Sequence, residues 1–221
     1  MKELTDHLPK PLLMVAGKTL LEHQLDIMPD EVDEVIIIVG YLEDMIKEKF
    51  GIEYNGKKII YVHQEKLDGT GGALWLAKPY LKDVFIVTAA DNIFDAEDVK
   101  EASCYPWSIV GIEVDDVGRA AKMIIDESDR VMNILEVDDP AHDRSPGFLN
   151  TALYCLDTKV FDYPLVPKSP VSNEYGLPQT LVQSGVDLHL IKAKFWIEIT
   201  VPEDLQKAEE ILAKRVETVS A

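Results

Sequence analysis

The chain has 221 residues, of which 47% are hydrophobic and 28% are charged, and its formal net charge is −18. These proportions are typical of a globular domain with a buried core and exclude an intrinsically disordered chain. The acidic balance excludes a basic nucleic-acid-binding surface and argues against binding to anionic membranes, although backbone N–H groups and Mg²⁺ can still hold small anionic ligands.

The first half of the chain alternates apolar strands with amphipathic helices. Apolar residues at helical spacing predict a helix from Leu21 to Met28, and further helices are expected over 41–50 and 70–81. Continuous apolar runs predict buried strands over 35–39, 58–63 and 84–88. This order predicts an α/β, Rossmann-like fold with a mostly parallel mixed sheet and helices on both faces. Ligands of such folds bind beyond the C-terminal ends of the strands.

The second half of the chain no longer alternates strands with helices. Strands are expected over 108–114, 121–126, 131–137 and 151–157, which together predict a small antiparallel extension of the sheet. A last strand over 195–199 precedes a terminal helix, for which Thr200 and Glu203 have the spacing of a capping box. Residues 142–147 are the candidate for a mobile loop.

Neither targeting signals nor metal-binding cysteines are found. Residues 1–10 are polar and lack the apolar region of a signal peptide, and the longest apolar run, residues 35–39, is too short to span a bilayer. Cys104 and Cys155 have no metal-ligand spacing, so we expect them to be buried free thiols. The sequence therefore predicts a cytoplasmic protein.

Two segments have the chemistry of a phosphate or nucleotide site. Lys10 lies between two prolines, which fix the direction of the chain and so of the ammonium group. Gln64 is followed by a glycine-rich turn with Gly69 and Thr70, where backbone N–H groups can approach a ligand and the amide of Gln64 can bind a base edge. The alternatives are a solvated lysine and a flexible turn with Thr70 as the helix N-cap.

Two carboxylates have the placement of metal ligands. Asp91 directly follows the apolar run 84–88, where it can hold Mg²⁺ on phosphate oxygens. The alternative role for Asp91 is to cap the next helix, but Asp95 is better placed for that cap. Glu198 alternates with apolar neighbours on the predicted strand 195–199 and can supply a second carboxylate; the alternative is a solvent-facing strand residue.

Taken in order, these motifs resemble the sugar-1-phosphate nucleotidylyltransferase family over nearly the whole chain. The motifs that carry the resemblance are Pro-Lys-Pro-Leu, Val-Ile-Ile-Ile-Val-Gly-Tyr, Gln-x4-Gly-Thr-Gly, a strand followed by Asp-Asn, and Trp-x-Glu-x-Thr-x-Pro-Glu-Asp-Leu. The resemblance implies a soluble enzyme that joins a nucleoside triphosphate to a sugar 1-phosphate and releases pyrophosphate. It implies no nucleic-acid or membrane partner, and the sequence leaves a homo-oligomer open.

The resemblance also implies a role for individual residues. Lys10, Asp91 and Glu198 would be catalytic, with Asp91 and Glu198 as ligands of Mg²⁺. The nucleotide would be bound by Lys10, Gln64, Gly69, Thr70 and Asp91. The sugar phosphate would be bound by Glu136, Asn150, Thr151 and Lys194. One domain is expected over 1–221, with a nucleotide-binding half at 1–105 and a sugar-phosphate-binding half with the C-terminal helix at 106–221.

The sequence departs from the family pattern at several positions. The family's opening strand and its Gly-x-Gly-Thr-Arg loop are missing, and Met1 falls where the methionine of that loop would be, so we expect a start that is truncated relative to the family. Ala90 replaces the usual glycine before the metal-binding aspartate, Val137 replaces a lysine, and Glu198 replaces an aspartate. A lysine at 192 or 194 is the candidate to compensate for Val137.

Two other functions fit the same residues. A non-catalytic paralogue that binds nucleotide or nucleotide-sugar would explain the missing loop and Val137. A cytidylyltransferase for phosphocholine or another phosphorylated acceptor would keep the chemistry and change the acceptor, since one fold serves several acceptors. Tyr154, Trp107 and Trp196 are the candidates for an aromatic choline site.

Overall fold

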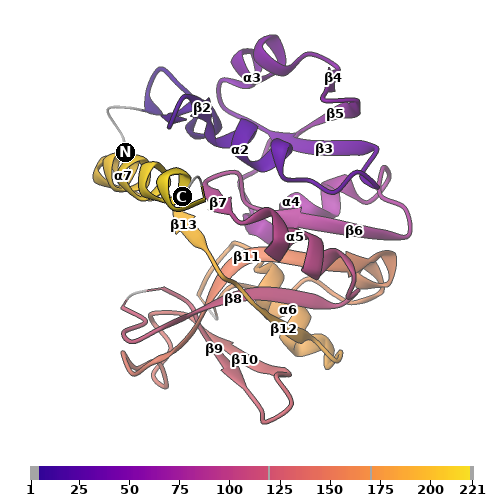
Figure 1. The fold of residues 1–221 in the computed structure, drawn as a ribbon. Coiled ribbons are helices and arrows are strands. Elements are labelled where there is room, and N and C mark those ends of the chain that lie inside the picture. Colours follow the sequence, from indigo (N-terminus) through magenta and orange to yellow (C-terminus); the bar gives the residue numbers. More distant parts are fainter. Residues whose placement is uncertain (1–4, 119, 170, 220–221) are drawn as a thin grey trace.

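The computed structural model describes residues 5–118, 120–169 and 171–219 of the chain (Figure 1). The elements of its first half are η1 (Lys10–Leu12), β1 (Met14–Val15), β2 (Lys18–Thr19), α2 (Leu20–Asp26), β3 (Glu34–Val39), α3 (Glu43–Phe50), β4 (Glu53–Tyr54), β5 (Lys57–His63), α4 (Gly69–Ala77), β6 (Val84–Thr88), β7 (Asn92–Phe94) and α5 (Ala96–Ser103). The second half comprises β8 (Ser108–Val114), β9 (Lys122–Ile125), β10 (Val131–Leu135), β11 (Gly147–Asp157), η2 (Thr158–Asp162), α6 (Leu177–Ser184), β12 (His189–Lys192), β13 (Trp196–Glu198) and α7 (Pro202–Val219).

The strands form mixed sheets, which confirms the α/β class. A six-stranded sheet has the order β10-β9-β11-β8-β12, with β6 paired to β11. A three-stranded sheet has the order β3-β5-β4, and two-stranded sheets join β1 to β2 and β13 to β7. Among the described strands, parallel pairing is confined to β3–β5 and β8–β12, so antiparallel pairing is more extensive than the sequence predicted.

The strand β3 is less buried than its apolar sequence predicts. It pairs with β5 in register from Glu34 opposite Lys58 to Val39 opposite His63, but in the described part of the chain no strand pairs with its other edge. Only Val39 is buried; the other residues of β3 are half-buried. A strand with a partner on one side only leaves part of its apolar surface uncovered.

The apolar residues gather into two main clusters. The larger lies on the six-stranded sheet and under α4 and α6, and it includes Leu74, Ile109, Tyr154 and Leu177. The second packs α2 and α3 against β3 and β5. Figure 1 shows these two parts one above the other, with β6 and β7 between them.

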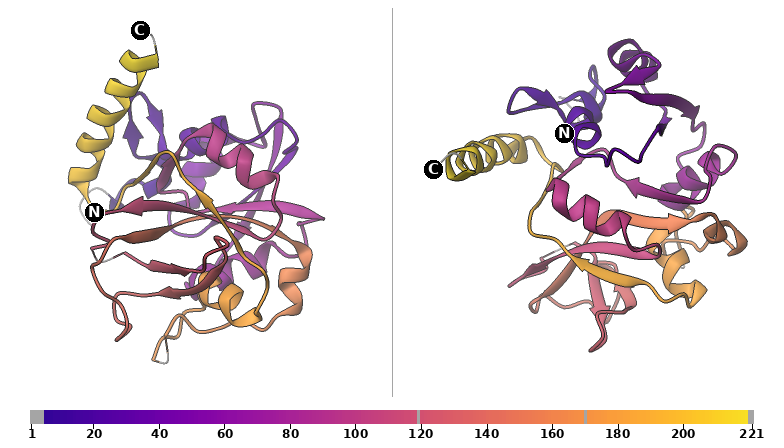
Figure 2. Two further views of the ribbon diagram at one scale, coloured as in Figure 1. Left: turned by 60° about the horizontal axis from the view of Figure 1, so that its bottom comes forward. Right: turned by 45° about the vertical axis from the view of Figure 1, so that its right-hand side comes forward.

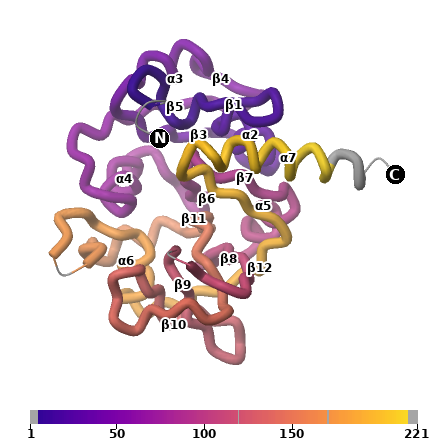
Figure 3. Tube along the Cα trace, turned by 90° about the vertical axis from the view of Figure 1, so that its left-hand side faces the viewer, coloured from indigo at the N-terminus to yellow at the C-terminus, as the bar shows by residue number. Residues whose placement is uncertain are grey.

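The terminal helix α7 was predicted correctly, but its N-terminal cap was not. Thr200 and Glu203 form no capping box; instead the N–H groups of Thr200 and Val201 donate to Asp204 Oδ2, each at 2.9 Å. The helix extends from the body of the molecule in both views of Figure 2 and lies beside β1 in Figure 3. Ala208 is its buried contact with the cluster around Val15.

Of the two cysteines, Cys155 is buried and Cys104 is exposed, and both are free thiols. The prediction of free thiols is thus confirmed, but the prediction of burial is wrong for Cys104. Burial raises the pKa of the Cys155 thiol to about 11. None of the described helices is long and apolar enough to cross a membrane.

Candidate active site

The two predicted carboxylates come together where β6 ends. Asp91 follows β6, and Glu198 lies on β13 opposite Asn92 of β7, so the two strands carry both residues to one place (Figure 1). The N–H of Ile199 donates to the carbonyl of Asp91 at 2.9 Å. Although Glu198 keeps contact with solvent, loss of water around it and the negative charge of Asp91 both raise its pKa. Two carboxylates thus lie close enough for their charges to interact.

Lys10 is the cation of this cluster. It begins η1 between Pro9 and Pro11, and its Nζ donates to Asp91 Oδ2 at 2.6 Å. The same ammonium group acts on Glu198, whose pKa it lowers against the larger effect of burial. The contact with Asp91 therefore fixes the ammonium group beside the carboxylates, a position that the prolines alone did not predict.

The segment that holds Asp91 is fixed by buried polar contacts that the sequence analysis missed. Gln24 of α2 is 2% exposed, and its Nε2 donates to the carbonyls of Ala89 and Asn92. Trp196 of β13 donates through Nε1 to Asn92 Oδ1 at 2.9 Å. These contacts join α2, β7 and β13 around Asp91. Helical spacing alone predicted only that this face of α2 is buried.

Asp98 secures the other end of β13. It is fully buried on α5, and its Oδ2 accepts from the N–H groups of Lys194 and Phe195 at 2.8 and 3.2 Å. Burial raises the pKa of this carboxyl group. Asp95, as predicted, caps α5 by accepting from the N–H of Glu97 at 3.0 Å. Of the acidic residues in this segment, Asp91 is therefore the candidate metal ligand, Asp95 caps α5 and Asp98 holds the start of β13.

The glycine-rich turn is packed more tightly than a flexible turn would be. Gly69 has φ +93°, and a Cβ atom there would lie 2.4 Å from the carbonyl oxygen of Tyr175. Thr70 is inside α4 rather than at its N-cap, which is Asp68, and its Oγ1 accepts from the N–H of Leu177 at 3.1 Å. The glycines therefore allow α4 to approach residues 174–177, and the threonine hydroxyl joins α4 to α6.

Gln64 is held by its own loop. Its N–H donates to the carbonyl of Val39 at 2.8 Å, and its Nε2 donates to Asp68 Oδ1 at 3.0 Å. Gly72 provides the space for this contact, because a Cβ atom at that position would lie 2.0 Å from Asp68 Oδ1. The amide of Gln64 is thus oriented by a carboxylate that the sequence analysis did not consider.

Two of the predicted sugar-phosphate residues, Glu136 and Asn150, both lie near the hydroxyl of Tyr154. Glu136 follows β10 and accepts at Oε1 from Gln179 Nε2 at 2.9 Å. Asn150 Nδ2 donates to the hydroxyl of Tyr154 at 2.9 Å, and the negative charge of Glu136 acts on that hydroxyl. Burial is the main reason that the pKa of Tyr154 is raised. Gln179 was not predicted as a site residue, and Tyr154 was considered only for an aromatic choline site; no local motif marks either of them as a neighbour of the sugar-phosphate candidates.

Thr151 and Ala152 adopt special positions in β11. Thr151 is fully buried, and its hydroxyl donates to the carbonyl of Val110 at 2.7 Å, which leaves this hydroxyl proton engaged within the protein. Ala152 has φ +59°, in the left-handed region, and the register between β11 and β8 shifts between Asn150 and Tyr154. The left-handed region favours glycine, so an alanine here is held by the surrounding strands.

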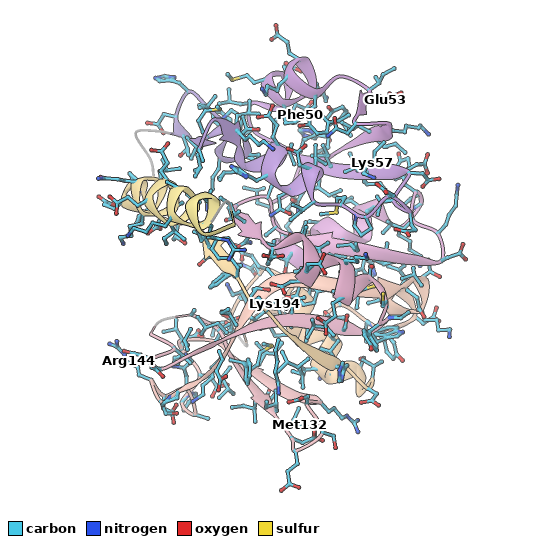
Figure 4. The ribbon with its side chains drawn as sticks, viewed as in Figure 1. Phe50, Glu53, Lys57, Met132, Arg144 and Lys194 are labelled. Atoms are coloured by element: carbon cyan, nitrogen blue, oxygen red, sulfur yellow. The ribbon has the colours of Figure 1, made fainter. Side chains whose placement is uncertain are left out.

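The two lysines near β13 differ in their contacts. Lys192 Nζ lies 2.9 Å from Asp129 Oδ1, so it does not take the place of the lysine missing at 137. Lys194 is exposed on the segment between β12 and β13, where Figure 4 labels it. A third lysine, Lys122, is 8% exposed and contacts Asp143 Oδ1 at 2.5 Å and Ser145 Oγ at 2.6 Å. It ties the predicted mobile loop to β9.

The aromatic residues suggested for a choline site do not converge. Tyr154 lies in the core under α6, and Trp196 packs in the separate cluster around Phe94. Trp107 lines a cavity of about 550 Å³ with Tyr105, Arg130 and His189, none of which is among the predicted site residues. The structure therefore provides no aromatic cage from these three residues.

Comparisons with known proteins identify the family of the chain. A model of the nucleotidyl transferase family matches residues 1–215. The bifunctional protein GlmU of Methanocaldococcus jannaschii is 28% identical over 99% of the chain, but the match covers 52% of that protein, so the chain spans about half the length of this relative. The D-glycero-alpha-D-manno-heptose 1-phosphate guanylyltransferase of Campylobacter jejuni is 27% identical, over 92% of the chain and 90% of that protein. Among solved structures, HddC from Yersinia pseudotuberculosis superposes with a TM-score of 0.71 at 28% identity, over 93% of the chain and 90% of HddC, and it has also been solved with GMP-PN.

The carboxylates suit the metal that the family resemblance implies. In the described part of the chain no group of three or more His, Cys, Asp or Glu residues is placed to hold a metal ion. Asp91 and Glu198 are therefore a pair without a third protein ligand of these types. This fits Mg²⁺, which is commonly held by one or two carboxylates together with substrate phosphates.

Proposed function

The chain belongs to the nucleotidyl transferase family, and from that membership we propose that it transfers a nucleotide from a nucleoside triphosphate to a sugar 1-phosphate, in nucleotide-sugar biosynthesis. The observation that supports this most directly is the cluster of Lys10, Asp91 and Glu198, which three distant segments bring together. One cation and two carboxylates in one place suit transfer at phosphorus, where positioning and charge neutralisation supply most of the catalysis.

In the proposed reaction, a phosphate oxygen of the sugar 1-phosphate attacks the α-phosphorus of the triphosphate. The new O–P bond forms as the bond from the α-phosphorus to the bridging oxygen breaks, and pyrophosphate leaves with that electron pair. Lys10 neutralises charge on the phosphates with its ammonium group. Asp91 and Glu198 would hold Mg²⁺, which when bound would neutralise phosphate charge beside Lys10.

The other residues divide into a nucleotide side and a sugar side. We assign residues 1–105 to nucleotide binding, with Gln64, Gly69 and Thr70 in the base-binding segment. We assign residues 106–221 to the sugar phosphate, with Glu136, Asn150, Thr151 and Lys194 as its candidate contacts. Thr151 is fully buried and its hydroxyl donates to Val110, so its part would be to hold the segment beside Asn150.

The comparisons do not favour the two alternatives. The Campylobacter relative is named for transfer to a sugar 1-phosphate, and the chain covers most of its length. A phosphocholine acceptor has less support, because Trp196 packs in a different apolar cluster from Tyr154 and Trp107.

The test is release of pyrophosphate by the purified chain with Mg²⁺. Each assay contains one triphosphate, which is UTP, dTTP, GTP, ATP or CTP, and one sugar 1-phosphate, which is that of glucose, N-acetylglucosamine or mannose. A further assay pairs CTP with phosphocholine. Pyrophosphate that requires both a triphosphate and a sugar 1-phosphate is the expected result. Release only with phosphocholine, or with no pair, contradicts the proposal.

A further inference from the structure

The carboxylate of Glu136 is held by a neutral amide. Within the described part of the chain, this side chain accepts one hydrogen bond, from Gln179 Nε2 at 2.9 Å. Glu136 is half-buried, and none of the lysines and arginines within residues 5–118, 120–169 and 171–219 forms an ion pair with it. A carboxylate with a single neutral donor keeps further lone pairs for a ligand, and sugar hydroxyls are donors of the right kind.

The orientation of the Gln179 amide is energetically unfavourable for one of its two polar atoms. Its Oε1 is buried and has no hydrogen-bond partner among the described residues. A buried carbonyl oxygen without a donor is unfavourable and calls for an explanation. Rotating the amide by 180° would bring Oε1 against the carboxylate of Glu136. The charge of Glu136 therefore selects the orientation in which Nε2 faces it and Oε1 is left unpaired.

Gly176 makes room for this orientation. A Cβ atom on Gly176 would lie 1.6 Å from Gln179 Oε1 and 2.7 Å from its Cδ, which no real contact allows. Gly176 has φ −95°, which any residue adopts, so backbone conformation does not demand glycine here. The requirement for a small residue comes from the amide of Gln179.

The backbone around Gly176 is fixed, so an added side chain cannot be relieved by a shift of the chain. The N–H of Gly176 donates to the carbonyl of Val166 at 2.9 Å, and its own carbonyl accepts from the Thr180 hydroxyl at 2.8 Å. On the next residue, the N–H of Leu177 donates to Thr70 Oγ1. The flexible end of Gln179 is the part that must move.

We propose that Gln179 is a positioning residue that holds the carboxylate of Glu136 for the hydroxyl groups of the sugar 1-phosphate, and that Gly176 is required because it leaves space for the Gln179 amide. This inference rests on the proposed function. It adds Gln179, which lies on α6, and Gly176, which is the N-cap of α6, to the sugar side of the site.

The test compares four variants of the full chain: Gln179→Leu, Gly176→Ala, the double variant Gly176→Ala/Gln179→Leu, and Gln183→Leu as the matched control. Gln183 is an exposed glutamine on the same helix. KM for the sugar 1-phosphate, KM for the triphosphate, kcat and thermal stability are measured for each. Gln179→Leu is expected to raise the sugar KM about tenfold, because a hydrogen bond to a charged group is lost, with the triphosphate KM unchanged.

Gly176→Ala is expected to raise the sugar KM to the same extent, although it does not touch Glu136. The double variant is expected to match Gln179→Leu alone, because Oε1, the atom closest to the added methyl group, is then absent and the leucine methyl groups can rotate away from an alanine at 176. Gln183→Leu is expected to behave as wild type.

Two results would overturn the proposal: an unchanged sugar KM in Gln179→Leu, or additive effects of the two substitutions in the double variant. Both require an active wild-type enzyme. A wild type that releases no pyrophosphate with any substrate pair contradicts the proposed function instead, so the two failures are distinguishable.

Discussion

The Nζ atom of Lys10 lies 2.6 Å from Oδ2 of Asp91, and the two side chains retain 29% and 28% of their solvent exposure. The same ammonium group acts on Glu198. Lys10 therefore neutralises part of the charge that we assign to metal binding. A metal ion that binds Asp91 has to compete with this lysine.

We predict that Lys10→Met binds Mn²⁺, used in place of Mg²⁺, about fivefold more tightly than wild type when no nucleotide is present, because an ion pair of this exposure is worth up to about 1 kcal/mol. Free Mn²⁺ can be followed by electron paramagnetic resonance. Lys18→Met is the control, since Lys18 forms a 2.6 Å ion pair with the remote Asp26. Equal Mn²⁺ affinity in Lys10→Met and wild type would show that the lysine does not compete.

Asp91→Asn is predicted to reduce pyrophosphate release at least about 100-fold, because a charged group at the reacting phosphates is lost without a change of volume. The melting temperature should stay close to that of wild type. Asp26→Asn, which removes a carboxylate from an ion pair elsewhere, should keep wild-type rates. Wild-type turnover in Asp91→Asn would refute the assignment of Asp91.

Gly72→Ala tests the nucleotide side. The added methyl group would lie 2.0 Å from Asp68 Oδ1, so Asp68 must move away from Gln64. We expect a rise in the KM for the triphosphate of about tenfold, with no change in the KM for the sugar 1-phosphate. Asp68→Ala should give the same pattern. A change confined to the sugar KM would contradict the base-binding role of Gln64.

Stability near α2 is predicted to depend on the ionisation of Glu22. Burial alone would raise the pKa of this carboxyl group, but hydrogen bonds from Lys49 and Thr19 outweigh it and lower the pKa to about 2. A folded-state pKa below the unfolded value of 4.5 gives stability that is fully present above pH 4.5 and is lost as the pH falls towards 2.

Glu22→Gln should therefore lower the free energy of unfolding by about 1–2 kcal/mol at pH 7, the range of a lost capping interaction, and the difference from wild type should shrink between pH 4.5 and 2. Urea unfolding at several pH values measures this. Glu34→Gln, which breaks the exposed 2.7 Å ion pair with Lys58, should have little effect. A difference that is independent of pH would contradict the predicted role of the charge.

Several elements could be predicted from the sequence because their signals are local. The strands at 84–88 and 108–114 have the predicted bounds, since each is an apolar run bounded by polar or turn residues. Asp95 caps α5 as predicted, because an N-cap needs only the next few residues. The positions of Asp91 and Glu198 at strand ends follow from the same local patterns.

The spacing of residues along the chain could not predict which of two segments with the capping-box pattern forms the box. Thr19 and Glu22 form a capping box, whereas Thr200 and Glu203 share the spacing and do not. The difference is that Asp204 accepts from the N–H groups of Thr200 and Val201. The burial of β3 was overestimated for a related reason, because an apolar run does not reveal how many strands pair with it.

By itself, the sequence indicated the family and the α/β class, and it supplied the candidate residues for binding metal, phosphate and sugar. Only the tertiary structure decided which of them meet. The contact of Lys10 with Asp91, the support of Glu136 by Gln179 and the space that Gly72 and Gly176 leave for neighbouring side chains all join residues on different elements or different turns. Such contacts depend on how elements pack, which residue spacing along the chain does not encode.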